Sequence, residues 1–288
     1  MNQLLSKVQT GFENLQISQE YKNIALENIK KWLENDQFSG YKKQLIHLID
    51  TKQFELLLDS FYQVIPFGTG GRRGEVGIGD NRINTWTIQA SAQGHSDYLL
   101  QKYGKDAKTR GIVISYDGRQ FTEESYFSDE FENPIKNITS KEFAFCAAQV
   151  YIANGIRSYI FDEARSTPEL SFAIRYFKAV SGLIISASHN PKEFNGKKVY
   201  SEDGGQLIPP EDQQLSDIVA KVKEIKKIEL DNAGDLLVKN IDKKVDEAYI
   251  KSISALASKK IDKKDLKIIY SPLHGVGTSS VYATLIKN

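Results

Sequence analysis

The residues best suited to group transfer form the run Ser186-Ala187-Ser188-His189-Asn190-Pro191, which follows a short apolar segment. Pro191 cannot continue a paired strand, so we expect Ser188 to lie on a turn. A serine hydroxyl becomes a nucleophile when a base removes its proton or when it carries a group to transfer. His189 is adjacent to Ser188, and neighbouring side chains rarely point the same way, so a triad of the hydrolase kind is not expected. On these local features alone, a turn serine without chemistry is the stronger alternative.

A pair of lysines follows a few residues later, in the run Asn195-Gly196-Lys197-Lys198-Val199-Tyr200. Adjacent side chains on a strand point to opposite faces of a sheet. One of the two lysines could therefore face the functional edge and supply a cation or a proton. The alternative is a pair of solvated surface lysines, which is the commoner situation.

An arginine pair lies in the glycine-rich run Gly68-Thr69-Gly70-Gly71-Arg72-Arg73-Gly74. Glycine lets the backbone approach a phosphate closely, and arginine binds phosphate through two parallel hydrogen bonds. The run matches neither the Walker pattern nor Gly-x-Gly-x-x-Gly. A simple tight turn is equally compatible with it.

A fourth polar run, Tyr116-Asp117-Gly118-Arg119, follows an apolar segment. An Asp-Gly pair is typical of a turn. The functional interpretation is that Asp117 or Arg119 steadies the loop that carries Ser188.

The elements that must position these residues alternate between strand and helix patterns. We expect strands over 111–115, 158–161 and 182–186, and helices over 85–103, 139–154 and 168–180. Thr139 and Glu142 have the spacing of a capping box, and Pro168 suits the first turn of a helix. This order predicts an α/β fold with a mostly parallel sheet covered by helices. The loops at Asp117, at 166–167 and at Ser188 follow strands, so they should meet at the ligand-binding edge of the sheet.

The flanking regions have different patterns. Residues 1–62 predict a helical extension that packs on the next domain, with Ser18 as an N-cap. Residues 63–215 contain the α/β pattern. Residues 216–288 predict a connection followed by the start of a second α/β domain, with helical stretches around 212–224 and 244–258 and a strand at 266–270. A strand and the start of one helix cannot bury a core, so the second domain is expected to be incomplete.

Composition limits the partners. The net charge of +1 gives no general attraction to nucleic acid or to an anionic membrane. The single cysteine, Cys146, allows no internal disulfide and no cysteine metal site, and no apolar run reaches the ~18 residues of a membrane span. We therefore expect a cytoplasmic protein that binds neither nucleic acid nor membrane; the sequence leaves its oligomeric state open.

Taken in order, the four polar runs resemble the α-D-phosphohexomutase superfamily of phosphoglucomutases and phosphomannomutases. The run around Ser188 is similar to the phosphoserine loop, and the others are similar to the loops that accompany it. Ser271-Pro272-Leu273-His274-Gly275-Val276-Gly277 is similar to the start of the second domain. The helical extension resembles the phosphoglucomutase/phosphopentomutase branch. The resemblance covers roughly residues 60–280.

The resemblance implies a set of roles. Ser188 would carry the phosphoryl group, one oxygen of which binds Mg²⁺, and Lys198 would act as general acid/base. His189 would contact the substrate region, and Arg73 would lie near the phosphoserine. The remaining candidates for binding substrate or phosphate are Arg72, Thr69, Asp117, Arg119 and Asn190. The family chemistry is exchange between hexose 1-phosphate and hexose 6-phosphate through a hexose 1,6-bisphosphate, with glucose 1,6-bisphosphate as activator.

The sequence also departs from the family. Arg72 occupies a position that is more often apolar, and the metal loop Asp-Gly-Asp-x-Asp-Arg is absent, as are the sugar-recognition and C-terminal phosphate loops. We therefore expect the N-terminal portion of such an enzyme, unable to complete the mutase cycle alone, with the substrate sugar undetermined. One alternative is a non-catalytic sugar-phosphate-binding or interaction protein of the same fold. A serine hydrolase ranks last, because the Gly-x-Ser-x-Gly elbow is missing.

Overall fold

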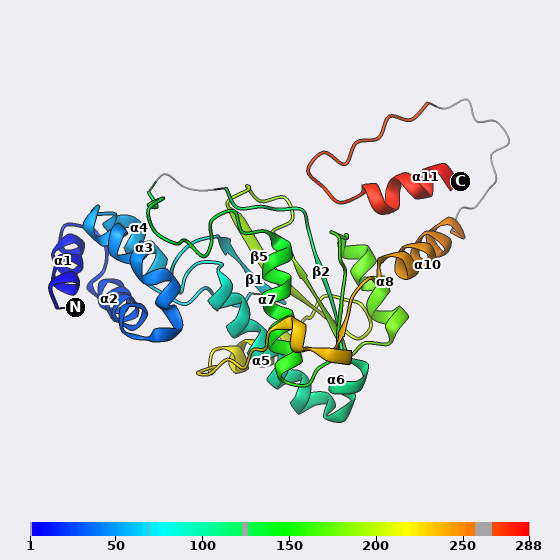
Figure 1. The fold of residues 1–288 in the computed structure, drawn as a ribbon, viewed down its shortest axis with the longest axis horizontal. Helices are drawn as coiled ribbons and strands as arrows, with labels where there is room; N and C mark the ends of the chain where they lie inside the picture. The colour runs from blue at the N-terminus through cyan, green and yellow to red at the C-terminus, as the bar shows by residue number, and fades with distance from the viewer. Residues whose placement is uncertain (1, 69, 123–125, 257–266, 288) are drawn as a thin grey trace.

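The computed structural model describes residues 2–68, 70–122, 126–256 and 267–287. Its centre is one mixed sheet of six strands in the order β1-β5-β4-β2-β3-β6 (Figure 1). The strands are β1 (Gly71–Glu75), β2 (Ile112–Tyr116), β3 (Ser158–Ile160), β4 (Ser181–Ile185), β5 (Phe194–Ser201) and β6 (Leu237–Val238). The fold class predicted from the sequence is confirmed.

The sheet is parallel in its middle and antiparallel at one side. Strand β2 pairs in parallel with β3 and β4, and β3 pairs in parallel with β6. The pairs β4–β5 and β1–β5 are antiparallel. The chain therefore turns back directly between β4 and β5, and the run around Ser188 is the turn of that hairpin.

Helices cover both faces of the sheet. Helices α5 (Thr85–Tyr103) and α7 (Ser140–Ala153) contact each other on one face, where α9 (Glu211–Val219) also packs on α5. Helices α8 (Thr167–Phe177) and α10 (Asp242–Ser254) lie on the other face. Strand residues alternate between two apolar clusters accordingly, with Leu183 in one and Ile184 in the other.

The predicted helix boundaries agree with local capping chemistry. The Thr139–Glu142 capping box is present at α7, and Pro168 lies in the first turn of α8, which also has a capping box. The short helix α6 (Lys105–Arg110) follows Gly104, where the predicted helix ends.

The N-terminal region is helical, as its pattern predicts. It comprises α1 (Asn2–Glu13), α2 (Gln19–Glu34), the 3₁₀ turn η1 (Asp36–Phe38), α3 (Ser39–Asp50) and α4 (Phe54–Phe61). The side chain of Ser18 caps α2. These helices lie at one end of the molecule (Figure 1), and their buried side chains belong to the same apolar cluster as one face of the sheet. Trp32 stacks on Phe38, and Phe38 contacts Trp86 of α5.

The C-terminal region differs from the prediction. Two 3₁₀ turns, η2 (Leu230–Asn232) and η3 (Gly234–Leu236), lead into β6, which extends the same sheet beyond residue 215. The strand expected at 266–270 is wrong for the described residues 267–270, which carry no strand and leave Ile269 100% exposed. A strand needs a paired neighbour, and the described residues provide none there. The π-helical turn η4 (Thr278–Tyr282) and α11 (Ala283–Lys287) follow.

No helix within the described ranges is long and apolar enough to cross a membrane.

Candidate active site

Ser188 occupies the turn between β4 and β5 in a left-handed backbone conformation, with φ +58°. This conformation costs a residue with a Cβ about 1–2 kcal/mol. The turn is held locally, because the Ser188 amide donates a 3.0 Å hydrogen bond to Oγ of Ser186. Backbone strain of this kind clusters at functional sites.

Arg119 holds the same turn from the side of β2. All five of its side-chain N–H groups have acceptors, and four of these are main-chain carbonyl oxygens of the turn. They belong to Ser188 and Asn190 (both 2.8 Å from Nη2) and to Pro191 and Phe194 (2.7 and 3.1 Å from Nη1). The steadying role predicted for this run therefore agrees with the geometry. A direct phosphate contact does not, because the guanidinium has no donor left.

Asp117 completes the support of the turn. Its Oδ2 lies 3.2 Å from Nε of Arg119, and its Oδ1 accepts hydrogen bonds from the Arg119 amide (3.0 Å) and from Ser140 Oγ (2.7 Å). Ser140 Oγ also accepts a 2.9 Å hydrogen bond from Asn195, at the start of β5. A continuous polar chain thus joins β2, α7 and β5 beneath the turn.

A cavity of about 660 Å³ opens above these residues. Three segments line it: the loop after β2, the turn after β4 and the run that begins at His274. The lining includes Asp117, Arg119, Ser188, His189, Asn190, Lys192 and His274. Five of the candidate residues named from the sequence therefore share one concave surface.

His189 is closer to the nucleophile than its position in the sequence suggests. Its Nδ1 lies 3.3 Å from Ser188 Oγ. The expectation that adjacent side chains point apart is wrong here, because the left-handed turn at Ser188 brings consecutive side chains to the same side. His189 therefore lies within hydrogen-bond reach of the Ser188 hydroxyl.

Arg73 and Lys198 lie on one face of the β1–β5 pair. Arg73 is opposite Gly196, and Gly71 is opposite Lys198, so the two cations are diagonal neighbours. Nη1 of Arg73 donates a 3.1 Å hydrogen bond to Oδ1 of Asn190. Burial and the charge of Arg73 lower the pKa of Lys198, and the charge of Asp117 partly opposes this. A lysine with a lowered pKa is suited to accept and return a proton.

Arg72 and Lys197 are paired on the opposite face. Arg72 is 7% exposed, burial lowers its pKa to about 10, and its Nε has no partner among the described residues. This geometry does not support a phosphate contact for Arg72, because strand alternation turns its side chain away from Ser188.

Lys197 belongs to a buried polar cluster beneath the sheet. Its Nζ donates to the carbonyl oxygen of Ser91 (3.0 Å) and lies 5.6 Å from the centre of the Tyr151 ring. The Tyr151 hydroxyl is 2.8 Å from Nδ1 of His95, whose Nε2 is 3.2 Å from Oγ of Ser181. Burial, and then the charge of Lys197, lower the pKa of His95 well below its usual value.

The residues around Ser188 do not by themselves form a Mg²⁺ site. Mg²⁺ prefers several oxygen ligands. Among the described residues that line the cavity, Asp117 is the one carboxylate, and both its oxygens are bound to Arg119 or Ser140. The described part of the chain also contains no cluster of three His, Cys, Asp or Glu side chains suited to a metal.

Sequence reasoning missed two supporting serines, Ser186 and Ser140. Ser186 lies inside the motif, but Ser140 has no signal that separates it from any serine in the first turn of a helix. Thr69, a candidate phosphate ligand, lies outside the described residues.

Sequence comparisons indicate the family to which this domain is related. Residues 136–226 match the family model described as phosphoglucomutase/phosphomannomutase, alpha/beta/alpha domain I. The phosphoglucomutase of Staphylococcus haemolyticus strain JCSC1435 is 35% identical over 220 residues, which are 75% of this chain and 36% of that protein. The human phosphopentomutase is 31% identical over 256 residues, which are 87% of this chain and 40% of that protein.

The fold comparison points the same way. The open form of pp63/parafusin from Paramecium, an exocytosis-sensitive phosphoprotein described as a phosphoglucomutase, superposes with a TM-score of 0.50 and 19% identity. The superposition covers 78% of this chain and 43% of that structure. The fold agrees with the match of residues 136–226 to the first α/β domain of this family. The chain belongs to the α-D-phosphohexomutase superfamily, as its motifs predict. It spans about 36–40% of the length of the two curated relatives named above.

Proposed function

We propose that Ser188 is the phosphoryl carrier of a phosphoglucomutase-type enzyme. Such an enzyme exchanges hexose 1-phosphate and hexose 6-phosphate through a hexose 1,6-bisphosphate. One observation carries the proposal above the others: the Ser188 hydroxyl is presented beside His189 on a strained turn whose carbonyl oxygens are held by Arg119. A turn serine without chemistry would need neither the strain nor the clamp.

In the first transfer, a free hydroxyl of the sugar phosphate attacks the phosphorus atom of phosphorylated Ser188. The bond between phosphorus and Ser188 Oγ breaks as the new phosphorus–oxygen bond forms. Neutral Lys198 takes the proton of the sugar hydroxyl, and His189 gives a proton to the departing Ser188 oxygen. Arg73 neutralises charge on the transferring group, which is the main contribution a protein makes to such transfers.

The second transfer reverses these roles. The bisphosphate turns in the cavity and presents its other phosphate to Ser188. The Ser188 hydroxyl attacks, His189 takes its proton, and Lys198 returns a proton to the sugar oxygen. Atoms and charge balance over the two steps, so the enzyme ends phosphorylated as it began.

Substrate and metal are finer parts of the same proposal. Relatives act, by their names, on glucose and pentose phosphates. We propose a sugar phosphate as substrate, Mg²⁺ bound through the phosphoryl group of Ser188, and glucose 1,6-bisphosphate as activator. The chain spans well under half of the length of these relatives. We therefore propose that conversion of one sugar phosphate into the other uses residues outside the shared region, and that this chain carries out the transfer of a phosphoryl group to Ser188.

The test is intact-mass and phosphopeptide analysis after incubation with glucose 1,6-bisphosphate and Mg²⁺. The proposal expects one phosphoryl group on Ser188, and none on the Ser188→Ala variant. Phosphate on another residue, or equal labelling of the variant, would contradict it. If no label appears while glucose 6-phosphate still raises the melting temperature, the chain is instead the non-catalytic sugar-phosphate binder.

A further inference from the structure

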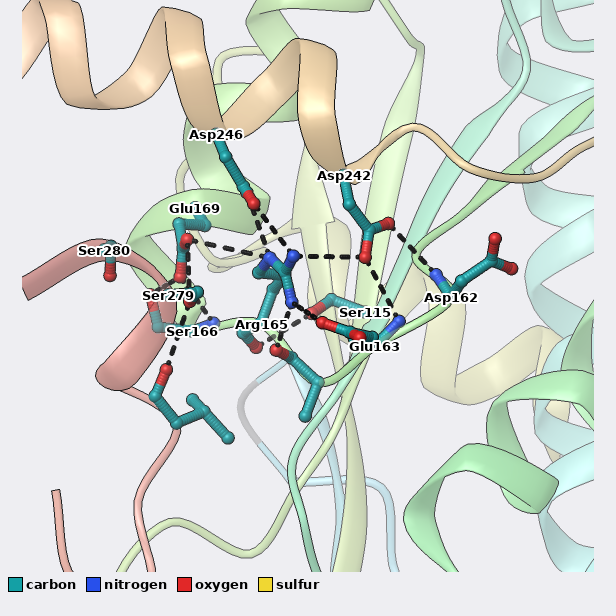
Figure 2. Close-up of polar contacts among 12 residues, drawn as sticks. Ser115, Asp162, Glu163, Arg165, Ser166, Glu169, Asp242, Asp246, Ser279 and Ser280 are labelled. Carbon is teal, nitrogen blue, oxygen red and sulfur yellow. Dashed lines mark hydrogen bonds and ion pairs between the residues drawn. The ribbon is translucent and has the colours of Figure 1, made fainter. Parts of the chain in front are cut away.

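A second polar cluster lies beside the candidate active site, around Arg165 in the loop between β3 and α8. Arg165 is 5% exposed. Figure 2 shows its guanidinium between two acidic residues of α10 and the loop that carries Glu163. Burial opposes its charge, and the hydrogen bonds and charge of Asp246 outweigh that effect, so the pKa of the guanidinium is raised.

Two acidic side chains of helix α10 bind Arg165 in this cluster. Asp246 accepts two hydrogen bonds from Arg165, 3.0 Å at Nε and 2.8 Å at Nη2. Asp242 lies 3.1 Å from Nη2 and also accepts from the amides of Asp162 (3.1 Å) and Glu163 (3.2 Å). The one buried residue of α10 is Val245. Val245 packs in the apolar cluster with α8, and Tyr249 contacts the ring of Phe172, so the ion cluster adds to an apolar contact between the two helices.

The main chain of Arg165 holds the end of β2. Its amide donates a 3.1 Å hydrogen bond to the carbonyl oxygen of Tyr116, and its carbonyl oxygen accepts a 2.9 Å bond from Ser115 Oγ. Tyr116 is followed in the chain by Asp117, whose carboxylate binds Nε of Arg119. Arg119 in turn donates to the carbonyl oxygen of Ser188. A single residue thus contacts α10 through its side chain and the support of the active-site turn through its backbone.

We propose that Arg165 is a positioning residue that couples the docking of α10 to the geometry of the Ser188 turn. With α10 docked, the acidic residues keep the guanidinium inside and the 162–166 loop lies against β2. Without the charge of Asp246, the buried guanidinium loses its two-pronged partner and keeps, within the described part of the chain, only the ion pairs with Asp242, Glu163 and Glu169, so it is held less firmly. The 162–166 loop is then freer to move relative to Tyr116, which loosens Asp117. The consequence for catalysis rests on the proposed function; the mechanical coupling does not.

The experiment compares Asp246→Asn with Glu247→Gln by hydrogen–deuterium exchange. Asp246→Asn keeps the shape of the side chain and removes its charge. Glu247 is exposed on the same helix and lines, with Arg165 and Asp246, one surface pocket. It has no ion pair with Arg165 among the described contacts, so its variant is the matched control. We expect Asp246→Asn to speed exchange about tenfold in peptides from α10 and from residues 186–192, which corresponds to ~1.4 kcal/mol. The control should leave both unchanged.

A second measurement links the coupling to the chemistry. Phosphorylation of Ser188 from glucose 1,6-bisphosphate should slow by a similar factor in Asp246→Asn and recover in Asp246→Glu. Unchanged hydrogen–deuterium exchange in α5 and α7 would show that the fold is intact. If exchange in these two helices rises in Asp246→Asn, Arg165→Lys replaces that variant, because it keeps the positive charge and loses the two parallel hydrogen bonds of the guanidinium.

Two outcomes overturn the proposal. If α10 exchanges faster while residues 186–192 behave as in the wild type, Arg165 anchors α10 and nothing more. If neither peptide changes, the ion cluster does not hold the helix. A wild-type protein that never labels at Ser188 would overturn the proposed function alone, because the exchange comparison still decides the coupling.

Discussion

Nη2 of Arg119 donates a 2.8 Å hydrogen bond to the main-chain carbonyl oxygen of Ser188. The candidate nucleophile is thus held through its backbone by a residue 69 positions earlier in the chain. The clamp leaves the Ser188 hydroxyl free while it fixes the turn that presents it. The guanidinium of Arg119 thus fixes the geometry of the turn, and in the proposed reaction the charge that faces the transferring group comes from Arg73.

Replacing Arg119 with lysine should slow phosphorylation of Ser188 at least about tenfold, because lysine cannot satisfy five acceptors and hydrogen bonds to charged groups contribute ~1.5–3 kcal/mol each. Single-turnover labelling with glucose 1,6-bisphosphate measures the rate. Lys192→Met is the control, since Lys192 lines the same cavity and contacts Thr122 without touching the turn's carbonyl oxygens. Equal rates for Arg119→Lys and the wild type would show that the clamp is dispensable.

The strain at Ser188 predicts a difference between two inactive variants. Glycine adopts a φ of +58° without penalty, so Ser188→Gly should be more stable than Ser188→Ala by about 1 kcal/mol. Urea denaturation followed by circular dichroism measures the free energy of unfolding. If alanine were the more stable variant, the left-handed conformation of this residue would be in error.

Lys198 should react as an amine at a lower pH than an ordinary lysine, because burial and the charge of Arg73 lower its pKa. Acylation with acetic anhydride over a pH series, read by fragment-ion mass spectrometry, compares Lys198 in the folded and unfolded chain. The folded curve should lie at lower pH. Arg73→Met should move it back upward, since a like charge is removed.

The neighbouring Lys197 is the internal control for that experiment. Its pKa is also lowered by burial, but its Nζ is enclosed and bonded to Ser91. It should therefore remain unlabelled in the folded protein at every pH. Labelling of Lys197 ahead of Lys198 would contradict the register of β5.

His95 makes stability sensitive to acid. Its pKa is lowered by burial, so the folded state keeps it neutral while the unfolded state binds a proton below about pH 6.5. Unfolding free energy should then fall as the pH drops through that range, by up to ~1.4 kcal/mol per pH unit for this one proton. His95→Gln loses buried contacts, so it is less stable at pH 8, but its deficit should shrink toward pH 5. A constant deficit would exclude His95 as the source.

The sequence predicted the elements whose signals are local. Thr139 and Glu142 mark the start of α7 with a capping box, and the helix at 85–103 ends at a glycine. It could not predict β1, because glycine and glutamate are depleted in strands and this strand exists through pairing with β5, more than a hundred residues away. The two-residue strand β6 could not be predicted either, because it lies in a lysine-rich stretch and exists only through pairing with β3.

The site divides in the same way. Ser188, Asp117 and Asn190 could be named because their side chains belong to recognisable runs. The Arg119 clamp could be anticipated only as a steadying role, since its acceptors are carbonyl oxygens that every residue possesses. Arg72 was misplaced because a run of letters does not say which of two adjacent arginines faces the site until the strand is known.

The β4–β5 hairpin has one more consequence. Lys198 pairs with Ile184 across this hairpin. The hairpin segment between these two residues contains Ser188, so its length fixes the register that places Lys198. Adding or removing a single residue in that loop would turn β5 over and exchange the surroundings of Lys197 and Lys198. The length of this loop, more than its composition, therefore decides which of the two lysines faces Arg73.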